Sequence, residues 1–377
     1  MRDILNTITQ WWDADEAFGL ATVVSTFRSA PRDPGAALAV AGGAVIGSVS
    51  GGCVEGAVYE LATEVTASGQ PVLQRYGFSD DDAFAVGLTC GGILDVFVEP
   101  VSKRTFPELG AIHEAVEQGT PVAVATVISG PGHVGARRVI WGDDTRESTG
   151  SLALGLDLAP GVDLDAAVDE DVRGMLAQGV TGIRHYGAHG ERGGDELSVF
   201  VNAFAPAPRM YVFGAIDFAA AVARTGKFLG YHVTVCDARP VFATRSRFPD
   251  ADEIVVDWPH RFLASAEVDA RTAIAVLTHD PKFDVPVLEV ALRSGAGYIG
   301  VMGSRRTHED RLERLRAVGV TDEELSRMRS PIGLDLGART PEETAISIAA
   351  ELIQLRWGGT GQPLTATEGR IHHQLTS

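Results

Sequence analysis

The residues best suited to bind a ligand lie in one glycine-rich segment near the N-terminus. Residues 47–56 contain four glycines and two serines, and residues 54–67 have the pattern of a helix. Backbone N–H groups in such a loop can form a concave site for an anion. We therefore predict a ligand-binding loop that runs into a helix, formed by Gly47, Ser48, Ser50, Gly51, Gly52, Cys53 and Glu55.

Cys53 is the residue of this loop with the most distinctive chemistry. It falls at the predicted start of the helix, where the helix dipole favours a thiolate. Glu55 lies in the same turn, and its charge favours the helix but opposes formation of the thiolate. The alternative is that Cys53 is a small buried hydrophobe beside a tight turn. Its place at the junction of loop and helix favours the functional interpretation.

A second segment, residues 87–92, repeats the combination of a cysteine with paired glycines. It reads GLTCGG and contains Cys90, Gly91 and Gly92. The spacing is not that of a zinc site, because there is no C-x-x-C pair. The two segments could bring two accessible thiols to one ligand, or both cysteines could simply be buried beside turns. The third cysteine, Cys236, ends an apolar strand and is expected in the core.

The elements that must position these residues fall into two groups. Residues 1–202 give strands and helices without regular alternation, which is typical of an α+β domain. The proline- and alanine-rich residues 203–208 predict a short linker. From residue 209 to residue 377, strands alternate with helices until a last helix that begins at Pro341. This pattern predicts an α/β protein with a C-terminal doubly wound, Rossmann-like domain.

Ligands of doubly wound domains bind outside the carboxyl ends of the strands. The residues expected there are Gly214, Asp237, Arg239, His279, Ser304, Arg305 and Arg306. Asp237 could bind a ribose, but the first turn reads Gly214-Ala215-Ile216-Asp217 instead of the dinucleotide fingerprint. Ile216 would block close approach of a pyrophosphate, and the charge of Asp217 would repel it. Three alternatives remain open: the crevice binds no dinucleotide, it binds a dinucleotide, or it binds another ligand.

The segment Ser304-Arg305-Arg306 is a candidate anion site within that crevice. Ser304 can cap a helix, and the two guanidiniums would lie at the positive end of its dipole. The alternative is a pair of solvated arginines on a charged helix. His279 could act as a base or bind a ligand, although a histidine held by its own turn is more common.

Composition restricts the class of partner. The chain has 377 residues, 45% of them hydrophobic, and a formal net charge of −18. This charge argues against nucleic acid and against anionic membranes, because both require a surplus of Lys and Arg. A small anionic ligand remains possible beside a local arginine cluster. With no apolar signal core and three sparse cysteines, a reducing cytoplasm is the expected compartment.

Taken together, these segments resemble the XdhC/CoxI family, accessory proteins of xanthine dehydrogenase and related molybdenum hydroxylases. The motifs keep their order over nearly the whole chain, whereas residues 100–200 contribute little. The resemblance is carried by Pro34–Ala36, Gly47–Glu55, Gly87–Gly92 with Glu99-Pro100, Thr278–Asp280, Tyr298–Arg306, Pro331–Asp335 and Thr340–Glu343.

The resemblance implies a chaperone that binds molybdenum cofactor (a molybdopterin) and assists its sulfuration and insertion into an apo-hydroxylase. Its implied partners are a cysteine desulfurase and a second copy of the chain. The two glycine–cysteine loops then become the candidate cofactor site, with Cys53 as the leading thiol. Such a carrier does not need to be an enzyme. The competing hypothesis is an NAD(P)-dependent oxidoreductase, which Ile216 and Asp217 disfavour, and a non-catalytic scaffold is a third.

Overall fold

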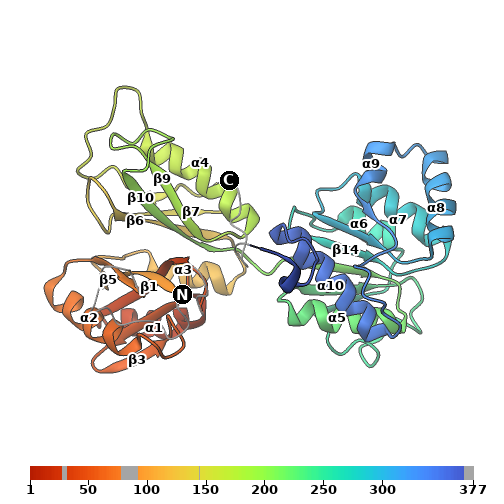
Figure 1. Cartoon of the computed structure of the whole chain (residues 1–377), viewed down its shortest axis with the longest axis horizontal. Coiled ribbons are helices and arrows are strands. Elements are labelled where there is room, and N and C mark those ends of the chain that lie inside the picture. The colour runs from red at the N-terminus through yellow and green to blue at the C-terminus, as the bar shows by residue number, and fades with distance from the viewer. Residues whose placement is uncertain (28–31, 78–91, 144, 369–377) are drawn as a thin grey trace. The chain divides into compact units, whose positions relative to one another are not determined.

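The computed structural model describes residues 1–27, 32–77, 92–143 and 145–368. The chain divides into two compact units, Met1–Pro206 and Ala207–Ser377 (Figure 1). In the described residues, no helix combines the length and the apolar character that crossing a membrane requires.

The first unit contains two five-stranded antiparallel sheets. One has the order β3-β2-β1-β5-β4, and the other has the order β8-β7-β6-β10-β9. The strands of the first are β1 Phe18–Phe27, β2 Ala37–Ala41, β3 Ala44–Gly47, β4 Val72–Tyr76 and β5 Ile93–Val101. Those of the second are β6 Val122–Ser129, β7 Arg137–Trp141, β8 Thr149–Gly150, β9 Gly182–Tyr186 and β10 Leu197–Phe204.

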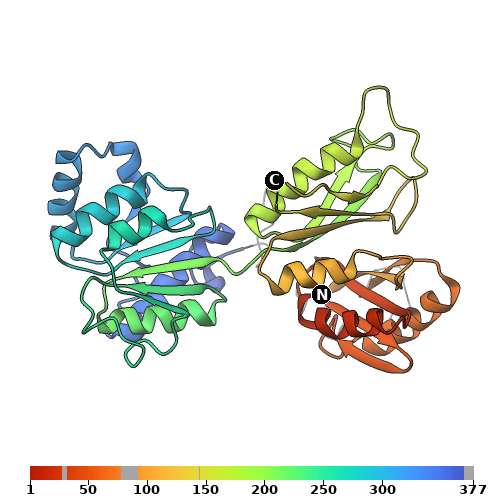
Figure 2. The same cartoon turned by 180° about the vertical axis from the view of Figure 1, so that it is seen from behind.

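Helices cover both sheets of this unit. They are η1 Arg2–Ile4, α1 Leu5–Asp13, α2 Glu55–Ser68, α3 Leu109–Glu117 and α4 Leu164–Gln178. Successive strand residues face opposite sides of a sheet, so β2 packs Leu38 and Val40 on the α2 side and its alanines on the α1 side. The α1 and α3 helices share a core with both sheets, and α4 packs on the far face of the second sheet (Figure 2).

The second unit is a six-stranded parallel sheet with the order β13-β12-β11-β14-β15-β16, as in a doubly wound fold. Its strands are β11 Arg209–Phe213, β12 His232–Cys236, β13 Glu253–Val255, β14 Ala273–Val276, β15 Tyr298–Val301 and β16 Met328–Arg329. Its helices are α5 Asp217–Phe228, α6 Pro259–Ser265, α7 Pro281–Leu292, α8 Arg305–Ala317, α9 Asp322–Ser326, α10 Pro341–Trp357 and η2 Leu364–Ala366. The α5 and α10 helices pack on one face, and α6, α7 and α8 pack on the other. The predicted fold class is confirmed.

Two local details follow from side-chain chemistry. Strand β10 ends at Phe204, which is buried, so only residues 205–208 connect it to β11. The sequence predicted a linker that begins two residues earlier, at residue 203. An apolar Ala-Phe pair before prolines looks like part of a linker when its packing is not known. The last helix begins as predicted: Thr340 and Glu343 form a capping box around Pro341.

Candidate ligand-binding site

The glycine loop of the first unit folds around the carboxylate of Glu55. This side chain accepts hydrogen bonds from the Ser48 hydroxyl at 2.7 Å, from the Ser50 amide at 2.9 Å and hydroxyl at 2.5 Å, and from the Gly52 amide at 2.7 Å. Burial opposes ionisation, but these hydrogen bonds outweigh it and lower the pKa of Glu55 to about 2. The amides of Ser50 and Gly52, which the sequence predicted for an anionic ligand, therefore bind the chain's own carboxylate.

Ser50 links this group of hydrogen bonds to the start of α2. Its buried hydroxyl oxygen accepts from the amides of Cys53 at 2.9 Å and of Val54 at 3.0 Å. The serine therefore satisfies N–H groups that lack partners at a helix start. Gly51 and Gly52 have φ values of +75° and +120°, and a Cβ on either would meet open space. Their backbone conformation, and not crowding, requires glycine here.

Cys53 lies where this loop meets α2. It is half-buried and packs against the core between α2 and the first sheet, with Ala36 and Ala57 beside that core. The structure thus brings Gly47 through Glu55 together in one compact loop.

The second glycine–cysteine segment can be located only at its end. Cys90 and Gly91 lie outside the described residues, whereas Gly92 is buried directly before β5. A Cβ on Gly77 would come within 2.6 Å of the Gly92 carbonyl oxygen, so the chain segments before and after this gap run close together. The convergence of the two cysteine loops stays a prediction.

In the second unit, Asp237 closes the first crevice turn. It is 3% exposed, and its two oxygens accept from the Ala215 amide at 2.7 Å and from the amide and guanidinium of Arg239 at 2.8–2.9 Å. Burial opposes its ionisation, but the bonds from Arg239 and Ala215 lower its pKa. Because both oxygens are occupied, Asp237 is not available to a ribose. Gly214 lies against Thr278, where a Cβ would approach to 2.7 Å.

The other predicted crevice residues are accessible. His279 is exposed in the loop between β14 and α7. Ser304 caps α8 by accepting from the Thr307 amide at 3.2 Å, and Arg305 and Arg306 are exposed in the first turn. The guanidiniums therefore lie at the positive end of α8, as predicted.

Sequence reasoning missed a buried ion pair behind this turn. Arg311 of α8 donates to Asp284 of α7 at 3.1 Å and to the Met302 carbonyl at 2.9 Å, and both ionic side chains are at most 5% exposed. Thr278 donates to the same carboxylate. Burial is the main cause that raises the pKa of Asp284 to about 6. The pair joins the loops after β14 and β15, but in the sequence both residues look like solvated helix charges.

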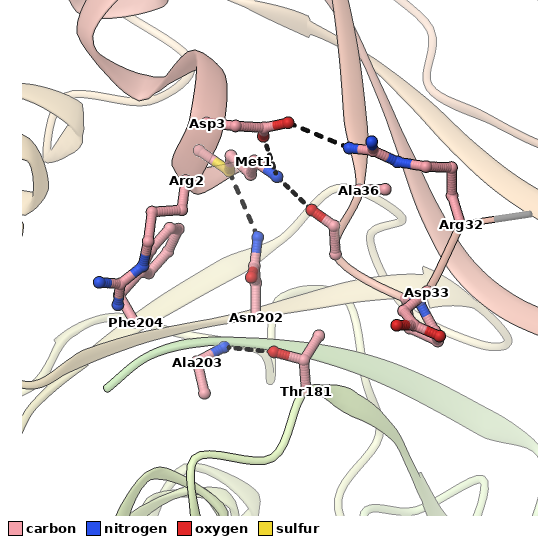
Figure 3. Close-up of a pocket in the computed structure, with 12 residues that line it drawn as sticks. Met1, Arg2, Asp3, Arg32, Asp33, Ala36, Thr181, Asn202, Ala203 and Phe204 are labelled. Atoms are coloured by element: carbon pink, nitrogen blue, oxygen red, sulfur yellow. Dashed lines mark hydrogen bonds and ion pairs between the residues drawn. The ribbon is translucent and has the colours of Figure 1, made fainter. Parts of the chain in front are cut away.

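It also missed a pocket of about 590 Å³ in the first unit, lined by Pro34–Ala36, Thr181 and Asn202–Phe204 together with the first three residues and Arg32 and Asp33 (Figure 3). A signal was present: Asn202 interrupts the apolar run of β10. An amide in a buried strand requires a partner.

Both units match known families. Residues 210–352 match the XdhC Rossmann domain, and residues 11–77 and 115–187 match the XdhC and CoxI family. The chain is 29% identical over 349 residues to a probable xanthine dehydrogenase subunit from Bacillus subtilis, covering 91% of this chain and 94% of that protein. It is 27% identical over 338 residues to the molybdenum cofactor insertion chaperone PaoD of Escherichia coli, covering 89% and 83%.

A solved structure resembles the whole chain. The crystal structure described as a xanthine dehydrogenase from Bacillus halodurans superposes with a TM-score of 0.66 at 25% identity. The match covers 97% of each chain.

Proposed function

Because the chain belongs to the XdhC and CoxI family, we propose that it is a chaperone that binds molybdenum cofactor and assists its insertion into a molybdenum hydroxylase. The finer proposal is a hydroxylase of the xanthine dehydrogenase type, with sulfuration of the cofactor by a cysteine desulfurase while the chaperone holds it. The chaperone acts as a homodimer in the cytoplasm. The names of the relatives from Bacillus subtilis and Escherichia coli support this direction.

The observation that carries the proposal is the position of Cys53 in a loop whose backbone is held by the side chains of Ser50 and Glu55. Ser50 holds the Cys53 amide, and Glu55 holds Ser50, so the thiol is presented from a fixed backbone. A cysteine thiolate is a soft ligand that suits molybdenum or a transferable sulfur atom. A carrier with such a ligand does not require an acid–base pair.

The loop fits only part of a molybdopterin. The dithiolene and metal suit a thiolate, but the loop amides that could hold the phosphate already bind Glu55. The phosphate therefore requires other donors or displacement of that carboxylate. The exposed pair Arg305 and Arg306 is a separate candidate for an anion.

The test is co-purification from cells that synthesise the cofactor, followed by oxidation to the fluorescent pterin product. We expect the wild type to carry pterin and the Cys53→Ser variant to lose most of it. Cys236→Ala is the matched control, because Cys236 is a buried cysteine of the second unit. Absence of pterin in the wild type, together with no binding of added cofactor, would refute the proposal.

A second assay separates a cofactor carrier from a scaffold that only recruits the hydroxylase. Maturation of the apo-hydroxylase by Cys53→Ala should fall if the thiol holds cofactor. Undiminished maturation would favour the scaffold.

A further inference from the structure

The pocket of the first unit lies where its two sheets meet. The turn before β2 supplies Pro34–Ala36, Thr181 directly precedes β9, and Asn202 belongs to β10 of the second sheet (Figure 3). Gly35 has a φ of +93°, and a Cβ there would come within 3.2 Å of Thr181 and 3.5 Å of Asn202. The turn is thus pressed against the second sheet. A volume of about 590 Å³ is within the range of pockets for small molecules.

Asn202 is the polar group of this pocket with the weakest partner. It is 8% exposed, yet its Nδ2 donates to the thioether sulfur of Met1 at 3.4 Å. A thioether is a weak acceptor, so a buried amide donor here is poorly satisfied. A ligand carbonyl in place of the Met1 side chain would be a stronger acceptor. Among the described residues, the Asn202 side chain makes no other hydrogen bond.

Two further features limit the ligand's chemistry. Thr181 accepts from the Ala203 amide at 3.1 Å, so its hydroxyl hydrogen can still donate. At the rim, Arg32 pairs with Asp3 at 3.0 Å, and both side chains are more than a third exposed. Such a pair is weak and rearranges at little cost. The Met1 ammonium, which pairs with Asp3 at 3.5 Å, and two arginines face Asp3 and Asp33, so the charges around the pocket nearly cancel, which is compatible with a neutral head group.

From these contacts we propose that the pocket binds a planar heterocycle through its lactam edge. An asparagine amide offers a donor and an acceptor in one plane, which matches the C=O and N–H of a lactam as it matches the edge of a base. Pro34 supplies apolar surface beside the ring. Pterins and oxopurines share this lactam edge. A pterin is the head group of the molybdenum cofactor, and oxopurines are substrates of purine hydroxylases.

The pocket is linked to the glycine loop through the start of β2. Ala36 lines the pocket, and the adjacent Ala37 carbonyl accepts from the Ser48 amide at 3.0 Å. The expectation of a pterin therefore rests on the proposed function, whereas recognition of a lactam does not. A chain that retains cofactor but ignores free rings would overturn the pocket inference alone. A chain that binds rings but never carries cofactor would overturn the proposed function alone.

The experiment measures binding of three free rings to the full chain by fluorescence quenching or calorimetry. They are 2-amino-4-oxopteridine, hypoxanthine, and 2-amino-3-methyl-4-oxopteridine, which keeps the pteridine ring and the carbonyl but has a methyl group in place of the lactam hydrogen. We expect at least one lactam compound to bind about tenfold tighter than the N-methylated compound. Tighter binding of the pterin identifies the cofactor head as the source, and tighter binding of hypoxanthine identifies the hydroxylase substrate.

Two variants of one residue test the role of Asn202. Asn202→Leu should remove the preference for lactams, and the nearly isosteric Asn202→Asp should weaken binding of both lactams, because a carboxylate accepts from the lactam N–H but repels the lactam carbonyl. Asn6→Leu on the exposed face of α1 is the matched control and should bind as the wild type does. Failure of both lactam rings to bind, or an unchanged lactam affinity in the folded Asn202→Asp variant, would overturn the inference.

Discussion

The carboxylate of Glu55 accepts hydrogen bonds from both the hydroxyl and the amide of Ser50, at 2.5 and 2.9 Å. Through this contact, a charged group in the first turn of α2 organises the loop that precedes it. Ser50 in turn holds the amide of Cys53. The position of the Cys53 thiol therefore depends on the carboxylate of Glu55, which belongs to the chain itself, and does not require a bound ligand.

We predict that Glu55→Gln loosens this loop. Loss of the charge-assisted bonds should cost about 1–2 kcal/mol, discounted for partial solvent exposure. Hydrogen exchange of the Gly52 and Cys53 amides should then accelerate about 5- to 30-fold at pH 7. Glu60→Gln, at an exposed position of α2, is the control. Equal protection in both variants would contradict the assigned role of Glu55.

The same carboxylate predicts a pH dependence. Its folded pKa of about 2 lies below the ordinary value of 4.5. Its contribution to stability is therefore complete above pH 4.5 and is lost as the pH falls towards 2. The difference in loop protection between wild type and Glu55→Gln should shrink as the pH is lowered from 5 to 3. A constant difference over this range would show that the carboxylate is not ionised in the folded loop.

The buried pair of Asp284 and Arg311 should be strongly coupled. Replacing either partner alone leaves an uncompensated buried charge, which costs about 3–5 kcal/mol. We expect Asp284→Asn and Arg311→Met each to unfold at clearly lower urea concentration. The double variant should recover part of the loss, because no unpaired charge remains. Additive losses would mean that the two side chains do not compensate each other.

Nicotinamide cofactors should not bind the second unit. Both oxygens of Asp237 are occupied by Ala215 and Arg239, and Asp217 begins α5 where a pyrophosphate would lie. Calorimetric titration with NAD and NADP should give no heat of binding. Measurable binding would revive the oxidoreductase hypothesis, despite Ile216.

The arginines at the start of α8 should matter for anions and not for folding. Arg305→Gln with Arg306→Gln should weaken binding of inorganic phosphate about tenfold, because two guanidiniums at a helix start are removed. Thermal stability should stay unchanged, since both side chains are exposed. Arg314→Gln, near the other end of α8, is the control. Equal affinity for phosphate in the wild type, the double variant and Arg314→Gln would mean that Arg305 and Arg306 are solvated surface residues without a binding role.

Several features were determined by the sequence alone. The alternation of strands and helices after residue 208 predicted the parallel sheet, and Thr340-Pro341 with Glu343 predicted the start of α10. The glycines and serines before Glu55 predicted a loop leading into a helix. These patterns are local, because periodicity, caps and turns depend on residues within one or two turns of each other.

Other features were decided only by tertiary structure. That Glu55 binds the amides of its own loop, and that Asp237 closes its own turn, depends on which donors the folded backbone turns towards each carboxylate. The pocket beside Asn202 required Gly35, in the turn before β2, to meet Thr181 before β9 and Asn202 of β10. Arg311 and Asp284 become a buried pair only when α7 packs beside α8. Such contacts join residues far apart in the chain, and no local pattern records which of them will meet.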